Sequence, residues 1–220
     1  PRVLMHLAAG SSFTIMIPTA WRALRSHLSL KVDFYSIYKL LVPGLVVGVI
    51  AGAIAAHFLH SNILRWVFAT LMVLVACKLL IFNSENRKEH SVKRVYKYAA
   101  GSIIGFFSGM LGIGGSTFVV PFLLACGYEM RRVIVVAMAC SLTTACVGCV
   151  SFLLTGMHSH GLPAWSTGYI YWPAVLMVSI GGVIAVPLGT WLSHKTSQKT
   201  LHKIFAVFLL ICAFHVVFNF

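Results

Sequence analysis

The chain has 220 residues, of which 59% are hydrophobic and only 10% are charged, and its mean hydropathy is +0.91. This composition excludes a water-soluble domain and predicts an all-α integral membrane protein that lies in a lipid bilayer. The formal charge of +13 does not indicate nucleic-acid binding, because the cations lie in short connectors between apolar runs, as is typical of the cytoplasmic side of membrane proteins.

The first half contains three apolar runs, at residues 3–24, 40–59 and 63–82. Pro18 predicts a kink in the first run, and the third is long enough to cross about 30 Å of hydrocarbon as a helix. In the second run Gly44, Gly48 and Gly52 recur every four residues, which places them on one helix face. We expect that face to approach another backbone closely.

Residues 83–97 are the one long polar stretch, and they predict a cytoplasmic linker between a first repeat, 1–82, and a second repeat, 98–220. The second half begins with a Gly-rich segment at 98–126. Apolar runs follow at 133–155, 172–192 and 201–220. The Trp and Tyr residues between 165 and 172 are typical of an aromatic belt at the membrane interface.

The Gly-rich segment predicts a helix break. Residues 101–121 read GSIIGFFSGMLGIGGSTFVVP, and Gly-Ile-Gly-Gly inside an apolar helix lowers helix stability. Broken backbone at membrane depth must be buried in protein or line a wet cavity, and a half-helix that starts near Gly115 would point free N–H groups and a positive dipole end into it. These features predict an anion site. The alternative is that the glycines only allow tight helix packing.

The two halves resemble one another. One shift of the sequence places Gly44, Gly48 and Gly52 over Gly181, Ala185 and Gly189, and a second places Ser11 and Thr14 over Ser141 and Thr144. These shifts predict an internal repeat, with chance agreement between small residues as the alternative. The counterpart of 101–130 in the first half would precede Pro1, so we expect the sequence to lack a segment there.

The loop charges predict how the repeats are oriented. If every apolar run crossed once, Lys and Arg would be divided about equally between the two faces. If the Gly-rich segment instead enters and returns as two antiparallel half-helices, only Arg2 and Arg65 lie outside and the other cations are cytoplasmic. The positive-inside rule favours this second arrangement, which is an inverted repeat with a re-entrant, broken helix pair, as in many secondary transporters.

Three blocks of the second half carry a family resemblance: GFFSGMLGIGGSTFVVP at 105–121, MRRVIVVAMACSLTTACVG at 130–148 and PLGTWLSH at 187–194. They resemble the second half of the TauE/SafE, or TSUP, family of sulfite exporters, and residues 1–82 resemble the rest of its first half. The resemblance implies a permease of the cell (inner) membrane for small sulfur-containing anions such as sulfite or organosulfonates. Ser116 stands where this family commonly has a glycine.

The substrate-binding candidates are the backbone and hydroxyl groups of the motif and of two polar clusters: Ser108, Gly112, Gly114, Gly115, Ser116 and Thr117, then Ser141, Thr143 and Thr144, and then Ser11, Ser12 and Thr14. The resemblance implies that the motif holds the anion, and the clusters would line the same cavity. A sulfonate oxygen accepts hydrogen bonds from such N–H and O–H groups. The alternative for each Ser and Thr is a bond to its own or a neighbouring helix.

Nothing in the sequence predicts a catalytic residue, a metal site or a cofactor. HExxH and GxSxG are absent, and Cys146 and Cys149 form one CxxC inside an apolar run, so we expect free thiols. Glu129 and His215 could couple transport to a proton, although a surface ion pair and a packing role are the simpler readings, and Asp33 is expected to pair with cations. The sequence does not decide whether a proton or another ion is coupled to transport, or whether the chain forms a homo-oligomer. The alternative functions are an accessory membrane subunit or inactive fragment, and a permease for a different small anion.

Overall fold

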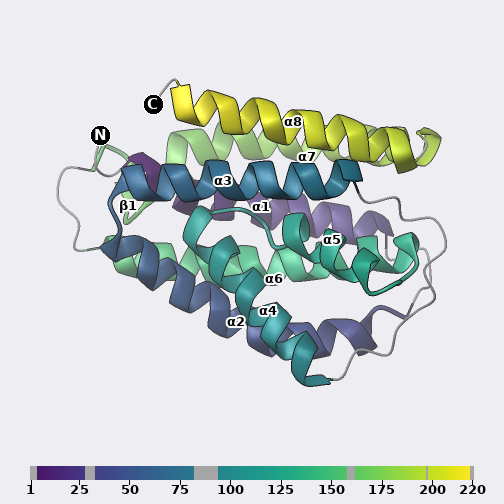
Figure 1. The fold of residues 1–220 in the computed structure, drawn as a ribbon. Helices are drawn as coiled ribbons and strands as arrows, with labels where there is room; N and C mark the ends of the chain where they lie inside the picture. Colours follow the sequence, from purple (N-terminus) through teal and green to yellow (C-terminus); the bar gives the residue numbers. More distant parts are fainter. Residues whose placement is uncertain (1–3, 28–32, 82–93, 158–161, 197, 219–220) are drawn as a thin grey trace.

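The computed structural model describes residues 4–27, 33–81, 94–157, 162–196 and 198–218, and these form a bundle of helices (Figure 1). The helices are α1 (Leu4–His27), α2 (Tyr35–Phe58), α3 (Ser61–Ile81), α4 (Arg94–Leu111), α5 (Ser116–Ala125), α6 (Met130–Gly156), α7 (Trp172–Lys195) and α8 (Gln198–Phe218). A short antiparallel hairpin, β1 (Ser166–Thr167) and β2 (Ile170–Tyr171), precedes α7. The predicted all-α class is confirmed.

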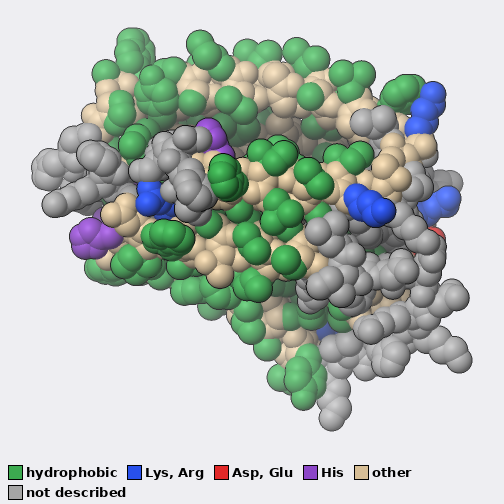
Figure 2. Space-filling view, turned by 45° about the horizontal axis from the view of Figure 1, so that its top comes forward, with side chains coloured by type: hydrophobic (Ala, Val, Ile, Leu, Met, Phe, Trp, Pro, Cys, Tyr) green, Lys and Arg blue, Asp and Glu red, His purple; other side chains and the backbone are tan. Residues whose placement is uncertain are grey.

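The apolar runs become the helices that the sequence predicts, and their outer surfaces suit lipid. By length and composition three described segments could cross a membrane, namely Tyr35–Phe58, Arg131–Gly156 and Trp172–Gly189. On α7 the apolar side chains of Leu176, Met177, Ile180, Ile184 and Leu188 are all more than 60% exposed. Figure 2 shows hydrophobic side chains over most of one face, with Lys and Arg mainly toward its right-hand end. Apolar outer faces between charged ends are what a bilayer requires.

Helices α2 and α4 pack with their backbones in close contact. A methyl group placed on Gly44, Gly48 or Gly52 would lie 2.3, 2.2 or 2.1 Å from a carbonyl oxygen of α4. The fit is reciprocal, because methyl groups on the α4 glycines would meet α2 carbonyl oxygens at 2.5 Å or less, at Gly101, Gly105 and Gly109. Only glycine permits this approach, so the predicted close packing of the Gly44–Gly52 face is confirmed.

Helices α4 and α5 enter the bundle and return to the same end. α4 runs inward to Leu111, and α5 runs back toward the end at which α4 starts (Figure 1). There the Lys97 ammonium, one turn into α4, donates to the Tyr128 hydroxyl just beyond α5 at 2.7 Å. The predicted break and return of the Gly-rich segment are therefore present. Of the linker predicted at 83–97, residues from Arg94 onward belong to α4, and residues 83–93 lie outside the described part.

The same end of the bundle is tied by an ion pair. Asp33, just before α2, lies 3.5 Å from the Arg132 guanidinium in the first turn of α6, and Arg132 Nε also donates to the Asp33 carbonyl oxygen. The predicted pairing of Asp33 with a cation is confirmed, although its partner comes from a distant helix and not from the neighbouring connector. The starts of α2, α4 and α6 are therefore fixed together at the end where α5 finishes.

The hairpin before α7 departs from the predicted aromatic belt. Trp165 is 81% exposed, but Tyr169 is only 5% exposed and packs among α1, α2 and α6. A methyl group on Gly10 or Gly156 would touch the Tyr169 backbone at 2.3 Å, so small residues on α1 and α6 admit the hairpin into the bundle. Tyr169 is thus a core residue and not a surface anchor.

Candidate functional site

The break between α4 and α5 is the irregular backbone on which the site is built. α4 ends at Leu111, Gly112 has φ of +70°, and α5 begins at Ser116 after the cap residue Gly115. The Ser108 hydroxyl donates to the Ile113 carbonyl oxygen, and the Ile113 N–H donates to the Ser108 carbonyl oxygen at 3.2 Å. Ser108 therefore fixes the turn from within and does not present its hydroxyl to a ligand.

The start of α5 has unsatisfied hydrogen-bond donors. No side chain caps it, and among the described residues no carbonyl accepts from the N–H groups of Gly114, Gly115 or Ser116. Such donors at a helix start, together with the positive end of the helix dipole, favour an anion.

The glycines of the break allow α1 and α6 to approach it. A methyl group on Gly112 would lie 2.4 Å from the Ala9 Cα of α1, and one on Gly115 would lie 2.9 Å from the Thr144 hydroxyl of α6. One on Gly114 would lie 2.6 Å from the Ser141 hydroxyl and would also displace the end of Met16. The break is thus held between α1 and α6, with two hydroxyls of α6 against it.

A cavity of about 490 Å³ opens at the break. Its walls come from α1, from the break and the first turn of α5, and from single residues of α3 and α8: Met5, Ala8, Ala9, Ser12, Met16, Leu111, Gly112, Ile113, Gly114, Ser116, Thr117, Phe68 and Val216. No charged side chain is among these residues. The volume falls within the range of small-molecule sites in proteins.

The structure brings part of the predicted site together. Five predicted residues line the cavity, namely Ser12, Gly112, Gly114, Ser116 and Thr117. No described residue hydrogen-bonds the hydroxyls of Ser12, Ser116 or Thr117, so these groups can donate to a ligand.

Four of the other predicted hydroxyls have protein partners, whereas Ser141 of α6 lies against Gly114. Ser11 accepts from the Tyr171 N–H at 2.9 Å, and Thr14 bonds the Gly10 carbonyl oxygen and the Cys149 sulfur. Thr144 donates to the Cys140 carbonyl oxygen of its own helix, and Thr143 bonds Tyr38. For these four residues the geometry matches the alternative that a hydroxyl bonds its own or a neighbouring helix.

Sequence reasoning missed the apolar lining of the cavity. Met5, Met16 and Phe68 have no polar group that would mark them, although Met5 and Met16 share the face of α1 that carries Ser12. Phe68 and Val216 reach the cavity only through the packing of α3 and α8, which the sequence pattern does not give.

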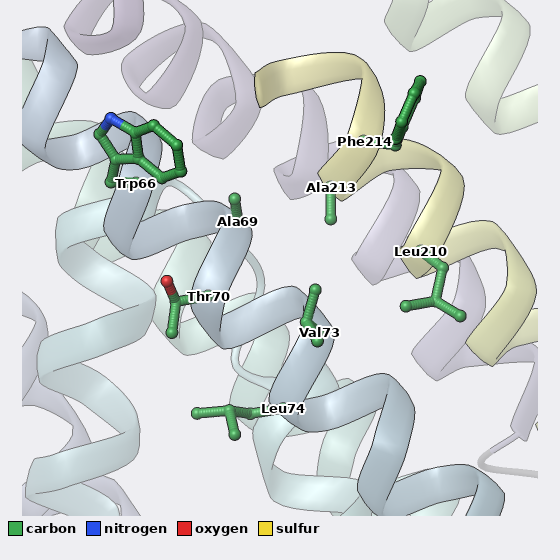
Figure 3. A pocket seen from close by; sticks show the side chains of 8 residues that line it. All are labelled: Trp66, Ala69, Thr70, Val73, Leu74, Leu210, Ala213 and Phe214. Carbon is green, nitrogen blue, oxygen red and sulfur yellow. The ribbon is translucent and has the colours of Figure 1, made fainter. Parts of the chain in front are cut away.

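A second cavity, of about 570 Å³, is a groove between α3 and α8 (Figure 3). Its lining is apolar apart from the Thr70 hydroxyl and the Trp66 indole N–H: Trp66, Ala69, Thr70, Val73, Leu74, Leu210, Ala213 and Phe214. An ion would lose its hydration there and gain two donors at most. This groove is therefore not an anion site.

Comparison with known proteins identifies the family. The family model described as sulfite exporter TauE/SafE matches residues 3–216. The chain belongs to the TauE/SafE family. A protein of Haemophilus influenzae named "Probable membrane transporter protein" is 30% identical over 96% of this chain and 80% of its own length. Similarly named proteins of Methanocaldococcus jannaschii and Bacillus subtilis are each 22% identical, over 90% and 99% of this chain and 73% and 82% of their own lengths. No solved structure matches the chain.

Family membership and the apolar helices together define the broad class. This TauE/SafE chain is a multi-pass membrane protein of a transporter family. The broken helix, the cavity and the free donors therefore belong to a protein whose relatives are named as transporters and not as enzymes.

Proposed function

We propose that this chain carries small sulfur-containing anions, such as sulfite or organosulfonates, across the cell (inner) membrane, and that the anion binds at the start of α5. The observation that carries the proposal is that residues with free donors line one cavity: Gly114 and Ser116 with their N–H groups, and Ser12, Ser116 and Thr117 with their hydroxyls. Sulfite and sulfonate oxygens act as hydrogen-bond acceptors, so a site made of donors complements them.

The uncharged lining also suits transport. A fixed cation in the cavity would hold an anion tightly and slow its release. Helix dipoles and hydroxyls bind an anion more weakly, so that it can both enter the cavity and leave it. In secondary transporters half-helix starts at mid-membrane act in this way. The inverted repeat stays part of this proposal, with the cationic ends of α2, α4 and α6 and the linker 83–97 on the cytoplasmic side.

The first test is thermal unfolding of the purified protein in the presence of sulfite, thiosulfate, sulfoacetate, taurine, sulfate or chloride. A ligand that binds the folded state stabilises it by about 2.7 kcal/mol at a hundred times its Kd. We expect a concentration-dependent rise in melting temperature with at least one of the sulfur oxyanions or sulfonates, and none with chloride. A rise with chloride alone would favour a permease for a different anion, and no rise with any of them would favour an accessory subunit.

A further inference from the structure

His6, in the first turn of α1, is a buried titratable side chain that the anion site does not use. It is 5% exposed, and its Nε2 lies 2.7 Å from the Ala56 carbonyl oxygen near the end of α2. A carbonyl oxygen can only accept a hydrogen bond, so Nε2 carries the proton. In the neutral ring Nδ1 is then an unprotonated acceptor.

Nδ1 lacks a donor in the described part of the chain. The second backbone group beside the ring is the Leu59 carbonyl, which is also an acceptor. The Ala56 carbonyl oxygen already accepts from the Leu59 N–H at 3.1 Å as well as from His6 Nε2. The imidazolium would keep that hydrogen bond and could donate a second one from Nδ1 to the Leu59 carbonyl, which the neutral ring cannot do. The negative end of the α2 dipole favours the same charged form.

A chain of aromatic groups connects His6 to the surface. The Tyr169 ring centroid lies 5.2 Å from that of His6 and 6.2 Å from that of His57, and the Tyr169 hydroxyl is 3.3 Å from His57 Nδ1. His57 is exposed near the end of α2. The exposed, titratable His57 is thus hydrogen-bonded to the tyrosine whose ring packs against His6.

The charged groups around His6 are few. His57 of α2 and Tyr169 of the hairpin are its titratable neighbours, and the first turns of α3 carry the cation Arg65. The carboxylates in the described part, Asp33 and Glu129, lie at the starts of α2 and α6, and α2 alone is about 36 Å long. No described carboxylate therefore competes for a proton at His6.

His6 does not line the anion cavity itself, but residues next to it on α1 do. Met5, which precedes His6, and Ala9, one turn further along α1, both line the cavity. Ala9 also packs against Gly112 in the turn between α4 and α5. A positive charge on His6 would attract an anion in the cavity through a poorly screened interior. Proton binding and anion binding would then strengthen each other by the same factor.

We propose that His6 is the proton-coupling site of this transporter: a proton from solvent adds to the Nδ1 lone pair and gives an imidazolium, which stabilises the anion bound at the start of α5, and loss of that proton releases it. This inference rests on the proposed transport function and adds to it the coupling ion and the site where that ion binds. Proton and anion then move in the same direction.

The test is an NMR titration of the full chain in nanodiscs with ¹⁵N-labelled histidine, the His6 signals being assigned by their loss in His6→Gln. The titration runs from about pH 8 down to about pH 5, and we expect the Nε2–H tautomer at its start and protonation of Nδ1 as the pH falls. Sulfoacetate, which is fully ionised from pH 6 to 8, should raise the midpoint. By reciprocity its Kd should weaken about fivefold or more between pH 6 and 8. In His6→Gln, whose amide can still donate to Ala56, that change should fall below about twofold.

The control is His60→Gln, in the exposed connection between α2 and α3, which should keep the pH dependence of the parent. If His6→Gln does not fold, His6→Asn replaces it. The proposal is overturned if His6 stays neutral across this range with and without sulfoacetate, or if His6→Gln keeps the full pH dependence. A His6 that titrates in a protein that binds no sulfoacetate would support the proton site and count against the proposed substrate.

Discussion

At the scale of single residues, the glycines of the segment 101–121 have two different uses. Gly101, Gly105 and Gly109 allow α4 to lie against α2, whereas Gly112 turns the chain with a positive φ. The two interpretations of the Gly-rich segment, a break and a packing surface, are thus both present, on successive parts of it.

Gly112→Ala tests the turn. A Cβ in this backbone conformation costs roughly 1–2 kcal/mol, and its overlap with Ala9 adds about 1–3 kcal/mol. At about 2–4 °C per kcal/mol for a chain of this size, the melting temperature in detergent should fall by at least about 4 °C. An unchanged melting temperature would mean that Gly112 is not held in this conformation.

The residue level is also where sequence reasoning reached its limit. The break and its donors could be predicted because glycine spacing and helix-end chemistry are local. The partners of Ser11 and Thr14 could not, since Tyr171 and Cys149 come from distant segments. The surroundings of His6 could not be predicted for the same reason, because Ala56 and Tyr169 are distant in the sequence.

At the scale of elements, α2 and α7 show how similar patterns can have different surroundings. Gly44 on α2 is buried against the Tyr98 carbonyl oxygen. Gly181 on α7 is its counterpart in the predicted repeat, and a methyl group placed there would have no atom of the described residues within 4 Å. The four-residue spacing of glycines predicted the packing face of α2 correctly. A similar spacing of small residues on α7 lies on an exposed face, and the sequence alone does not separate the two cases.

The two glycines offer a matched pair of substitutions. Gly44→Ala must push α2 from α4 and should lower stability by about 1–3 kcal/mol. Gly181→Ala meets nothing in the described part of the chain and should leave stability unchanged or raise it by up to about 1 kcal/mol through helix propensity. Thermal melts of both variants under one set of conditions check this. Equal melting temperatures would contradict the close α2–α4 contact.

At the scale of the whole molecule, α2, α4 and α6 begin at the same end of the bundle, and α5 finishes there. The Lys97–Tyr128 hydrogen bond and the Arg132–Asp33 ion pair hold α2, α4, α5 and α6 together there. Loop charges predicted this arrangement, because a second half that crossed once per run would have placed Arg131 and Arg132 at the opposite end from Lys97.

The central claim is that a small sulfur-containing anion crosses the membrane through the cavity at the start of α5. It is tested most directly by uptake of radiolabelled sulfite into proteoliposomes loaded with unlabelled sulfite. The parent should show saturable uptake above protein-free liposomes. Gly114→Leu, which fills the cavity beside Met16 and Ser141, should lose about tenfold or more of that rate, equivalent to about 1.4 kcal/mol, while Gly181→Leu keeps it. Uptake no faster than in protein-free liposomes, or parent-like uptake by Gly114→Leu, would contradict the claim.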